Sequence, residues 1–196
     1  MKKIAIDIVL LPDEWIQKIC REVNQDIGWK IDFVRTWKVP HISLMMWILH
    51  EDQIQEIFQI LTEISKSISQ MELTGKLKQY TIWNTWETGY SYELEESESV
   101  TKLFSEICEE IRPMLEYKNI SKDMFYMPEE VEEQSIVWVE WFEKRSVEEY
   151  SSHITLWIWK LISEHANMIH FTAPKLAVYQ LGNYCTCENK LLEIEL

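Results

Sequence analysis

The sequence has little glycine or proline: four glycines and five prolines occur among 196 residues. It therefore offers no stretch typical of a flexible linker, and its 46% hydrophobic and 12% aromatic content argues against a disordered chain. A chain of this length can bury the core of one domain or of a tight bilobal unit. We therefore predict a single domain over residues 1–196.

Basic residues are also scarce. The chain carries 19 lysines and arginines against 33 acidic residues, which gives a net charge of −14. A surface of this charge repels polyanions unless its basic residues gather in one cleft. The balance therefore disfavours a long nucleic acid as a partner. A small nucleotide or oligonucleotide needs only a local positive site, so it stays compatible with the charge.

Long apolar runs are missing from the sequence. No segment approaches the roughly 20 apolar residues of a membrane-spanning helix, so we expect no membrane partner. The apolar run after Lys3 is interrupted by Asp7 and followed by Pro12. This pattern favours a strand over residues 3–11 rather than a signal peptide.

The four cysteines are scattered along the chain. Cys185 and Cys187 would lie on one face of a strand, but no second pair completes a zinc site. We interpret all four as reduced thiols of a cytoplasmic protein.

Hydrophobic periodicity predicts strands and helices in both halves of the chain. The predicted strands cover residues 3–11, 31–34, 41–49, two or three segments within 71–94, 151–159, 174–181 and 184–196. The predicted helices run from Asp13 to about residue 25, from Asp52 onward, over residues 97–116 and from Pro128 onward. This order predicts an α+β fold of two similar lobes, with two mostly antiparallel sheets, outer helices and a central cleft. Residues 117–150 are interpreted as partly an insertion.

Two short stretches repeat the same order of residue types. Residues 40–44 are Pro-His-Ile-Ser-Leu, and residues 152–156 are Ser-His-Ile-Thr-Leu. In a strand, residues i and i+2 share a face, so the histidine and the hydroxyl residue point one way while the Ile and Leu point into a core. Each strand therefore offers one imidazole and one hydroxyl to a shared cleft: His41 with Ser43, and His153 with Thr155.

The repeated motif resembles the signature of the two-histidine (2H) phosphoesterase superfamily, also called 2′,5′ RNA ligase-like, which is a pair of His-x-Thr/Ser-x motifs in the two halves of one chain. The resemblance extends to an N-terminal strand that ends in Leu-Pro before a helix, to Trp37 ahead of the first motif, and to residues 176–184, which are similar to the family's closing strands. The first motif departs from the commoner pattern, because Ser43 stands where the family more often has Thr and so lacks β-branched stiffness.

The motif chemistry suits acid/base catalysis on a phosphate. A neutral imidazole can take a proton from the attacking water or hydroxyl, while a protonated imidazole gives one to the leaving oxygen. Ser43 and Thr155 would donate hydrogen bonds to the non-bridging oxygens. Which of His41 and His153 is the base stays open. Neither a carboxylate pair nor a histidine cluster accompanies the motifs, so we predict no metal and no cofactor. The other three histidines lack a matching frame and are interpreted as structural or surface residues.

Six further residues are candidates for binding the substrate. Aromatic residues within 83–90 could stack on a nucleobase from strands flanking the cleft. A tyrosine in the closing segment often lines the cleft in the family that the chain resembles, and basic residues before the first motif could add positive charge. Core packing and solvated strand ends are the alternative explanations. The six candidates are Trp83, Trp86, Tyr90, Tyr184, Arg35 and Lys38.

These residues favour a metal-independent phosphodiesterase that hydrolyses a cyclic or 2′-linked bond in a small nucleotide or oligonucleotide. One alternative is an RNA-end-processing 2′,3′-cyclic phosphodiesterase or ligase-like enzyme, against which the acidic charge counts. Another is a non-catalytic nucleotide-binding or protein-interaction module, which would have no need of two intact motifs.

Overall fold

The computed structural model describes residues 2–27, 32–34, 36, 38–81, 86–143, 150–158 and 167–196. The strands in these ranges are β1 (Lys3–Leu11), β2 (Ile42–His50), β3 (Met71–Thr81), β4 (Thr88–Leu94), β5 (His153–Ile158), β6 (Met168–Ala173), β7 (Lys175–Leu181) and β8 (Cys187–Glu195). The α-helices are α1 (Glu14–Ile27), α2 (Ile54–Ser65), α3 (Glu98–Ile111) and α4 (Glu133–Glu143). None of the helices described is long and apolar enough to span a membrane.

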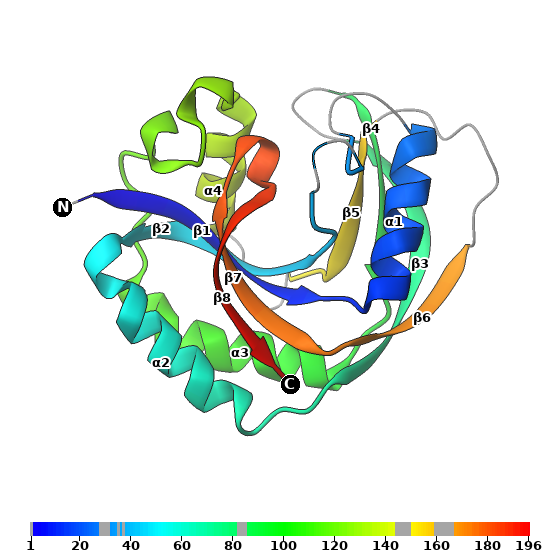
Figure 1. Ribbon diagram of the computed structural model, residues 1–196, viewed down its shortest axis with the longest axis horizontal. Coiled ribbons are helices and arrows are strands. Elements are labelled where there is room, and N and C mark those ends of the chain that lie inside the picture. Colours follow the sequence, from blue (N-terminus) through cyan, green and yellow to red (C-terminus); the bar gives the residue numbers. More distant parts are fainter. Residues whose placement is uncertain are drawn as a thin grey trace.

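The strands form one curled sheet in the order β6-β3-β4-β5-β2-β1-β7-β8, and all described pairings are antiparallel (Figure 1). The predicted α+β class with antiparallel strands and outer helices is confirmed. The two sheets of the prediction are joined, however, because β2 and β5 pair through Ile42 and Ile154, and no other β2–β5 pair occurs within the described strands. This single link lets the sheet curl sharply between its two halves.

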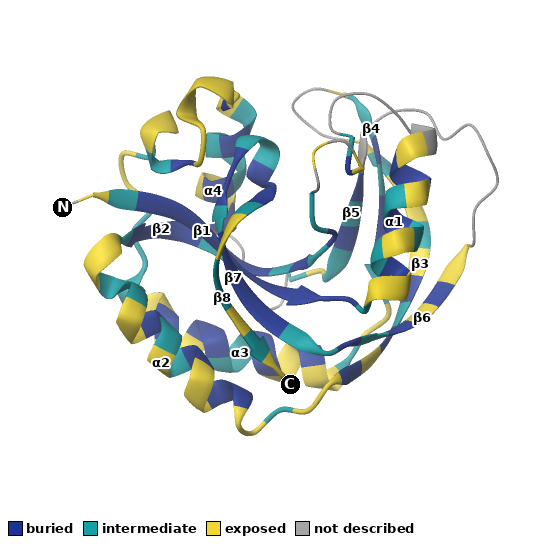
Figure 2. Ribbon diagram, viewed as in Figure 1, coloured by how far each residue is buried: buried dark blue, intermediate teal, exposed yellow. Residues whose placement is uncertain are grey.

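Three helices, α1, α2 and α3, cover one face of the curl. α1 begins after Asp13, whose carboxylate accepts a hydrogen bond from the Ile16 backbone N–H at 3.0 Å, as an N-cap residue does. α3 begins after Ser97, whose hydroxyl accepts from the Val100 N–H. Alternate residues of β1 join the core on this side: Ile4, Ile6, Ile8 and Leu10. Figure 2 shows that exposed residues are gathered on the outward sides of α1 and α2.

The opposite face of β1, β2 and β7 is covered by α4 and the turns before it. Val139 of α4 packs with Phe125 and Val131 against Ala5 and Leu181 in a second, smaller core. This region lies within the segment that the sequence marks as an insertion. β1 is covered on both faces, and from Ile4 to Leu11 it is apolar at every position except Asp7.

Several element boundaries differ from the prediction. Residues 32–34, part of a predicted strand, form a turn. The Asp32 carboxylate accepts a hydrogen bond from the Val34 N–H, and the Asp32 backbone carbonyl accepts one from the Thr36 N–H. Pro128 begins a 3-10 turn rather than α4, which begins at Glu133. α3 ends at Ile111, ahead of a 3-10 turn that contains Pro113. β6 was not predicted from the sequence.

Candidate active site

The two motif strands lie side by side at the centre of the sheet. Ile42 and Ile154 face each other across the β2–β5 link. These two residues and their neighbours Leu44 and Leu156 are each 0% exposed, so the predicted burial of the apolar motif positions is confirmed. The alternation of strand side chains then directs the remaining motif residues to the other face.

On that other face the four polar motif residues line one pocket of about 350 Å³. They are His41, Ser43, His153 and Thr155. The pocket lies within the size range of small-molecule sites, about 300–1,000 Å³. The structure therefore brings together the four residues that the repeated motif singles out.

The two imidazoles are held in the same way. His41 Nδ1 lies 2.7 Å from the Val39 carbonyl oxygen, and His153 Nδ1 lies 2.9 Å from the Ser151 carbonyl oxygen. A carbonyl oxygen only accepts, so Nδ1 carries the hydrogen in both rings. In a neutral ring this leaves the lone pair on Nε2. In each histidine, Nε2 is thus the nitrogen that can accept or donate the transferred proton.

The environment of His41 disfavours its charged form. Burial lowers the pKa of His41 from its ordinary value of 6.5, and the nearby charge of His153 lowers it further, against the opposing effect of the Val39 carbonyl. At neutral pH His41 is therefore mainly the neutral imidazole, which can accept a proton.

A buried carboxyl group lies beneath the first motif. Asp7 is 0% exposed, its Oδ2 lies 2.6 Å from Ser43 Oγ, and the same oxygen lies 3.8 Å from His41 Nε2. Burial raises the pKa of Asp7 well above its usual value, although hydrogen bonds from Ser43 and the Met45 backbone oppose the effect. The Ser43 hydroxyl donates to Asp7 Oδ2 in the structure. A protonated Asp7 could instead donate to Ser43 Oγ, and the Ser43 hydroxyl hydrogen could then turn to a ligand.

Side-chain hydrogen bonds secure the strands where the β2–β5 ladder is interrupted. The Tyr150 hydroxyl donates to the Ser43 carbonyl at 2.9 Å, and Asn24 Nδ2 of α1 donates to the Leu156 carbonyl at 3.0 Å. Asn24 Oδ1 also accepts from the Phe33 N–H at 2.8 Å, which fixes one part of the pocket wall. These bonds satisfy backbone groups that the sheet leaves unpaired.

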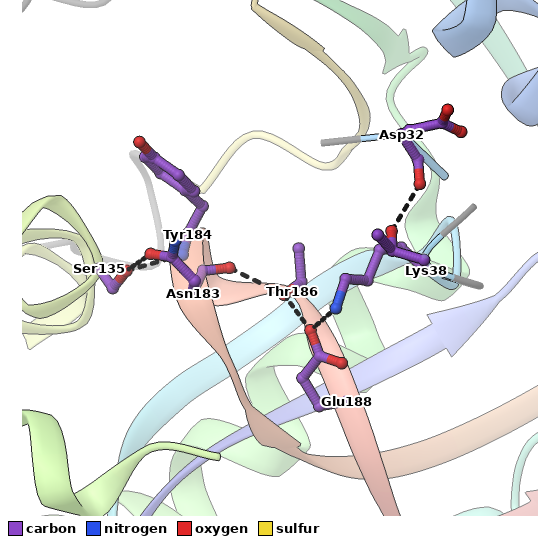
Figure 3. A network of polar contacts seen from close by, with 8 residues as sticks. Asp32, Lys38, Ser135, Asn183, Tyr184, Thr186 and Glu188 are labelled. Carbon is purple, nitrogen blue, oxygen red and sulfur yellow. Dashed lines mark hydrogen bonds and ion pairs between the residues drawn. The ribbon is translucent and has the colours of Figure 1, made fainter. Parts of the chain in front are cut away.

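The turn between β7 and β8 presents Tyr184 to the pocket (Figure 3). Tyr184 has φ 54° and ψ 33°, a left-handed conformation that is uncommon for a non-glycine residue. Its N–H donates to Ser135 Oγ of α4 at 2.7 Å, and that hydroxyl lies 3.2 Å from Asn183 Oδ1. The bonds to α4 hold the turn in this conformation.

Lys38 lines the pocket beside this turn and is paired with Glu188 of β8 (Figure 3). Both side chains are largely buried, at 17% and 16% exposure. Glu188 Oε1 also lies 2.6 Å from the Thr186 hydroxyl. An ammonium group has three donors, so Lys38 keeps capacity for a further anionic partner.

The other substrate-binding candidates are placed differently. Trp86 is 80% exposed and does not line the pocket. Tyr90 does not line the pocket either. Ser91 and Glu93 of β4 line it, so the alternation of side chains along the strand turns Tyr90 to the opposite face. There the Tyr90 hydroxyl donates a hydrogen bond to Gln79. Arg35 and Trp83 lie outside the described residues.

Several residues of the pocket were not foreseen as site residues. Ser91 and Glu93 face it from β4, where they pair with Thr155 and His153. α4 contributes an aromatic wall of Trp138, Trp141 and Phe142. The sequence contains one local signal for the region beneath the pocket, which is the acidic Asp7 within an apolar strand.

No protein-family model and no curated protein sequence matches this chain. Solved structures do resemble it. TT0787 of Thermus thermophilus superposes with a TM-score of 0.58 at 13% identity, over 98% of both chains. E. coli LigT superposes with a TM-score of 0.54 at 8% identity, over 100% of this chain and 99% of LigT. A protein described as a phosphoesterase gives 0.51 at 9% identity, over 98% of both chains.

The chain therefore shares the fold of these solved structures, LigT among them. Within that fold class it is similar to LigT across the whole length of both chains.

Proposed function

We propose that this protein is a phosphodiesterase that hydrolyses a cyclic or 2′-linked phosphodiester in a small nucleotide or oligonucleotide. The proposal is carried by one observation, the matched pair of histidines whose Nδ1 atoms are tied to backbone carbonyls beside a common pocket. A non-catalytic module would have no need for two imidazoles with the same fixed tautomer next to two hydroxyl groups. The fold similarity to a phosphoesterase supports the same conclusion.

In the proposed reaction, His41 acts as the base and His153 as the acid. His41 Nε2 takes a proton from water as the water oxygen bonds to phosphorus. The bond from phosphorus to the leaving ribose oxygen breaks, and its electron pair stays on that oxygen, which receives the proton of His153 Nε2. The hydroxyls of Ser43 and Thr155 donate to the non-bridging oxygens as negative charge grows there.

The assignment of the base follows from the surroundings of the two rings. Burial and the neighbouring His153 both favour neutral His41. Glu93 lies opposite His153 in the β4–β5 register, and its carboxylate is paired with Lys78. His153, the other imidazole of the pocket, then takes the role of the acid. Side chains of this protein thus carry out both proton transfers, and the proposed reaction needs no metal.

The proposed substrate class follows from the pocket and from the relatives. E. coli LigT structures contain ATP, 3′-AMP or NADP+. The aromatic wall of Trp138 and Trp141, together with Tyr184, whose ring lies 6.2 Å from that of Trp138, provides surfaces for a nucleobase. Stacking of one base on an aromatic side chain contributes about 1–3 kcal/mol. Lys38 would contact a phosphate of the same ligand.

A screen of small substrates in EDTA tests the proposal directly. We expect the purified protein to hydrolyse 2′,3′-cyclic nucleotides or short 2′-linked or cyclic oligonucleotides, with a rate that EDTA does not lower. The product of each reaction is identified by chromatography. Preferential action on the ends of longer RNA would instead indicate the RNA-end-processing alternative. Binding without turnover of every substrate would indicate a nucleotide-binding module.

Salt dependence tests the preference for small ligands. A small nucleotide meets few basic groups in the pocket, so its dissociation constant should change only modestly between 50 and 200 mM salt, less than about tenfold. A protein that contacts six to ten phosphates loses about 10³–10⁵ in affinity over that interval. Tight and steeply salt-dependent binding to long RNA would contradict the proposed substrate class.

A further inference from the structure

Three side chains with metal-binding atoms converge beneath the pocket, and one of them, His41, also lines it. They are Asp7 of β1, His41 before β2 and Cys187 at the start of β8. One ligand atom from each lies within 4.8 Å of the other two, and the distance from His41 Nε2 to Asp7 Oδ2 is 3.8 Å. Cys187 is a free cysteine and is 3% exposed.

Asp7 has an unmet need for a partner. Its Oδ1 is buried and makes no hydrogen bond of normal geometry with any described residue, although buried polar atoms are nearly always paired. Asp7 Oδ2 is already engaged by the Ser43 hydroxyl. A cation bound by the Asp7 carboxyl group would add a partner of opposite charge within this buried cluster.

The orientation of His41 also fits a metal ligand. Histidines that bind metals through one nitrogen usually donate the other N–H to a backbone carbonyl or carboxylate, which fixes the ring. His41 Nδ1 is bound to the Val39 carbonyl in this way, and Nε2 is the nitrogen directed toward Asp7. The region beneath the pocket therefore contains a preoriented imidazole next to a buried carboxyl group and a buried thiol.

The donor set selects the metal. One thiolate, one imidazole and one carboxylate suit Zn²⁺, whereas Mg²⁺ and Ca²⁺ prefer sites made of oxygen atoms. In a tetrahedral Zn²⁺ site, ligand atoms about 2.0–2.3 Å from the ion lie about 3.4–3.6 Å apart. The 3.8 Å separation of His41 Nε2 and Asp7 Oδ2 is close to this value, and all three ligand atoms lie within 4.8 Å of one another.

We propose that Asp7, His41 and Cys187 bind one Zn²⁺ ion beneath the pocket, and that this ion inhibits the enzyme. A carboxylate and a thiolate would balance the two charges of the ion. The ion occupies His41 Nε2, so His41 could no longer accept a proton. The inhibition rests on the proposed function, but the binding of the metal does not.

Metal binding is tested first, without any measurement of activity. Metal-free protein is titrated with Co²⁺ in excess Mg²⁺, which occupies acidic surface sites. We expect one Co²⁺ per chain, with the near-ultraviolet charge-transfer band of a thiolate ligand, and displacement of Co²⁺ by Zn²⁺. Cys187→Ser should lose the band and bind at least about tenfold more weakly. Cys185→Ser is the matched control, because this buried thiol lies two residues away and outside the cluster.

Thermal unfolding of each metal-free variant shows whether it folds. If Cys187→Ser does not fold, His41→Gln is used instead, because His41 borders the pocket. This variant should keep the thiolate band but bind Co²⁺ at least about tenfold more weakly. Absence of stoichiometric binding, or an unchanged band in Cys187→Ser, would overturn the proposed site.

Inhibition is tested once a substrate is hydrolysed. Zn²⁺ should reduce the rate in proportion to the bound fraction, and EDTA should restore it. Hydrolysis that continues with Zn²⁺ bound would refute the inhibition. Zinc binding without hydrolysis of any substrate would leave the metal site standing and remove the proposed function.

Discussion

Replacing His41 or His153 by alanine should lower kcat by about 10²–10⁴-fold, the usual contribution of one general acid or base. Each imidazole has its Nδ1 committed to a backbone carbonyl and so has a single nitrogen for the reaction. The double replacement should cost far less than the product of the two single effects, because groups that act as one unit are not additive. Steady-state kinetics on the three variants provide the measurement.

His170→Ala is the matched control for these variants. His170 lies on β6, is exposed and bonds to Thr74 Oγ1 at 3.0 Å. Its replacement should leave kcat within about twofold of the parent, because a surface substitution away from the pocket has little effect. A double variant of His41 and His153 that hydrolyses substrate at the parental rate would show that the paired motifs are not the catalytic centre.

The same assignment fixes the form of the pH profile. The base must be neutral and the acid protonated, so kcat/KM should be bell-shaped in pH. Because the pKa of His41 is lowered from 6.5, activity should rise through an acidic limb whose midpoint lies below pH 6.5, and fall again when the acid loses its proton. The two histidines interact, so the measured values belong to the pair. An acidic limb centred above pH 6.5 would contradict the assignment of His41 as the base.

Removing one hydroxyl of the motifs should have the second largest effect. Ser43→Ala and Thr155→Ala each delete one hydrogen-bond donor to the charged transition state, and the loss of such a donor lowers kcat by about 10²-fold or more. The conservative variants Ser43→Thr and Thr155→Ser keep a hydroxyl and should keep most of the rate. An equal loss in the alanine and the conservative variants would show that shape, rather than the hydroxyl, is what matters.

The two alanine variants should differ in stability. Ser43→Ala removes the hydrogen bond at 2.6 Å to buried Asp7, so an unsatisfied oxygen should lower the free energy of unfolding by about 1–3 kcal/mol. Among the described residues, no hydrogen bond joins the Thr155 hydroxyl to a buried carboxyl group. Thr155→Ala should therefore lower the free energy of unfolding by less than Ser43→Ala does. Urea unfolding of both variants measures the difference. Equal stability losses would contradict the role assigned to Asp7.

The sequence by itself determined the local parts of this site. Strand periodicity is two, so the order His-Ile-Ser-Leu already decides that His41 and Ser43 share one face while Ile42 and Leu44 share the other. The same holds for the second motif. The start of α1 after Asp13 and of α3 after Ser97 is equally local, because a cap acts within one turn of helix. Such features depend on a few neighbouring residues and can therefore be predicted from the sequence.

The tertiary structure alone decided what meets the two motifs. Asp7 and Cys187 belong to strands far from His41 in sequence, and only the order of the strands brings the three together. Among the described residues, α4 provides the aromatic wall, and Trp86 and Tyr90 do not line the pocket, because the packing of the helix determines which aromatic side chains reach it. Register across strands and the packing of a distant helix depend on contacts over the whole chain, and no local pattern encodes them.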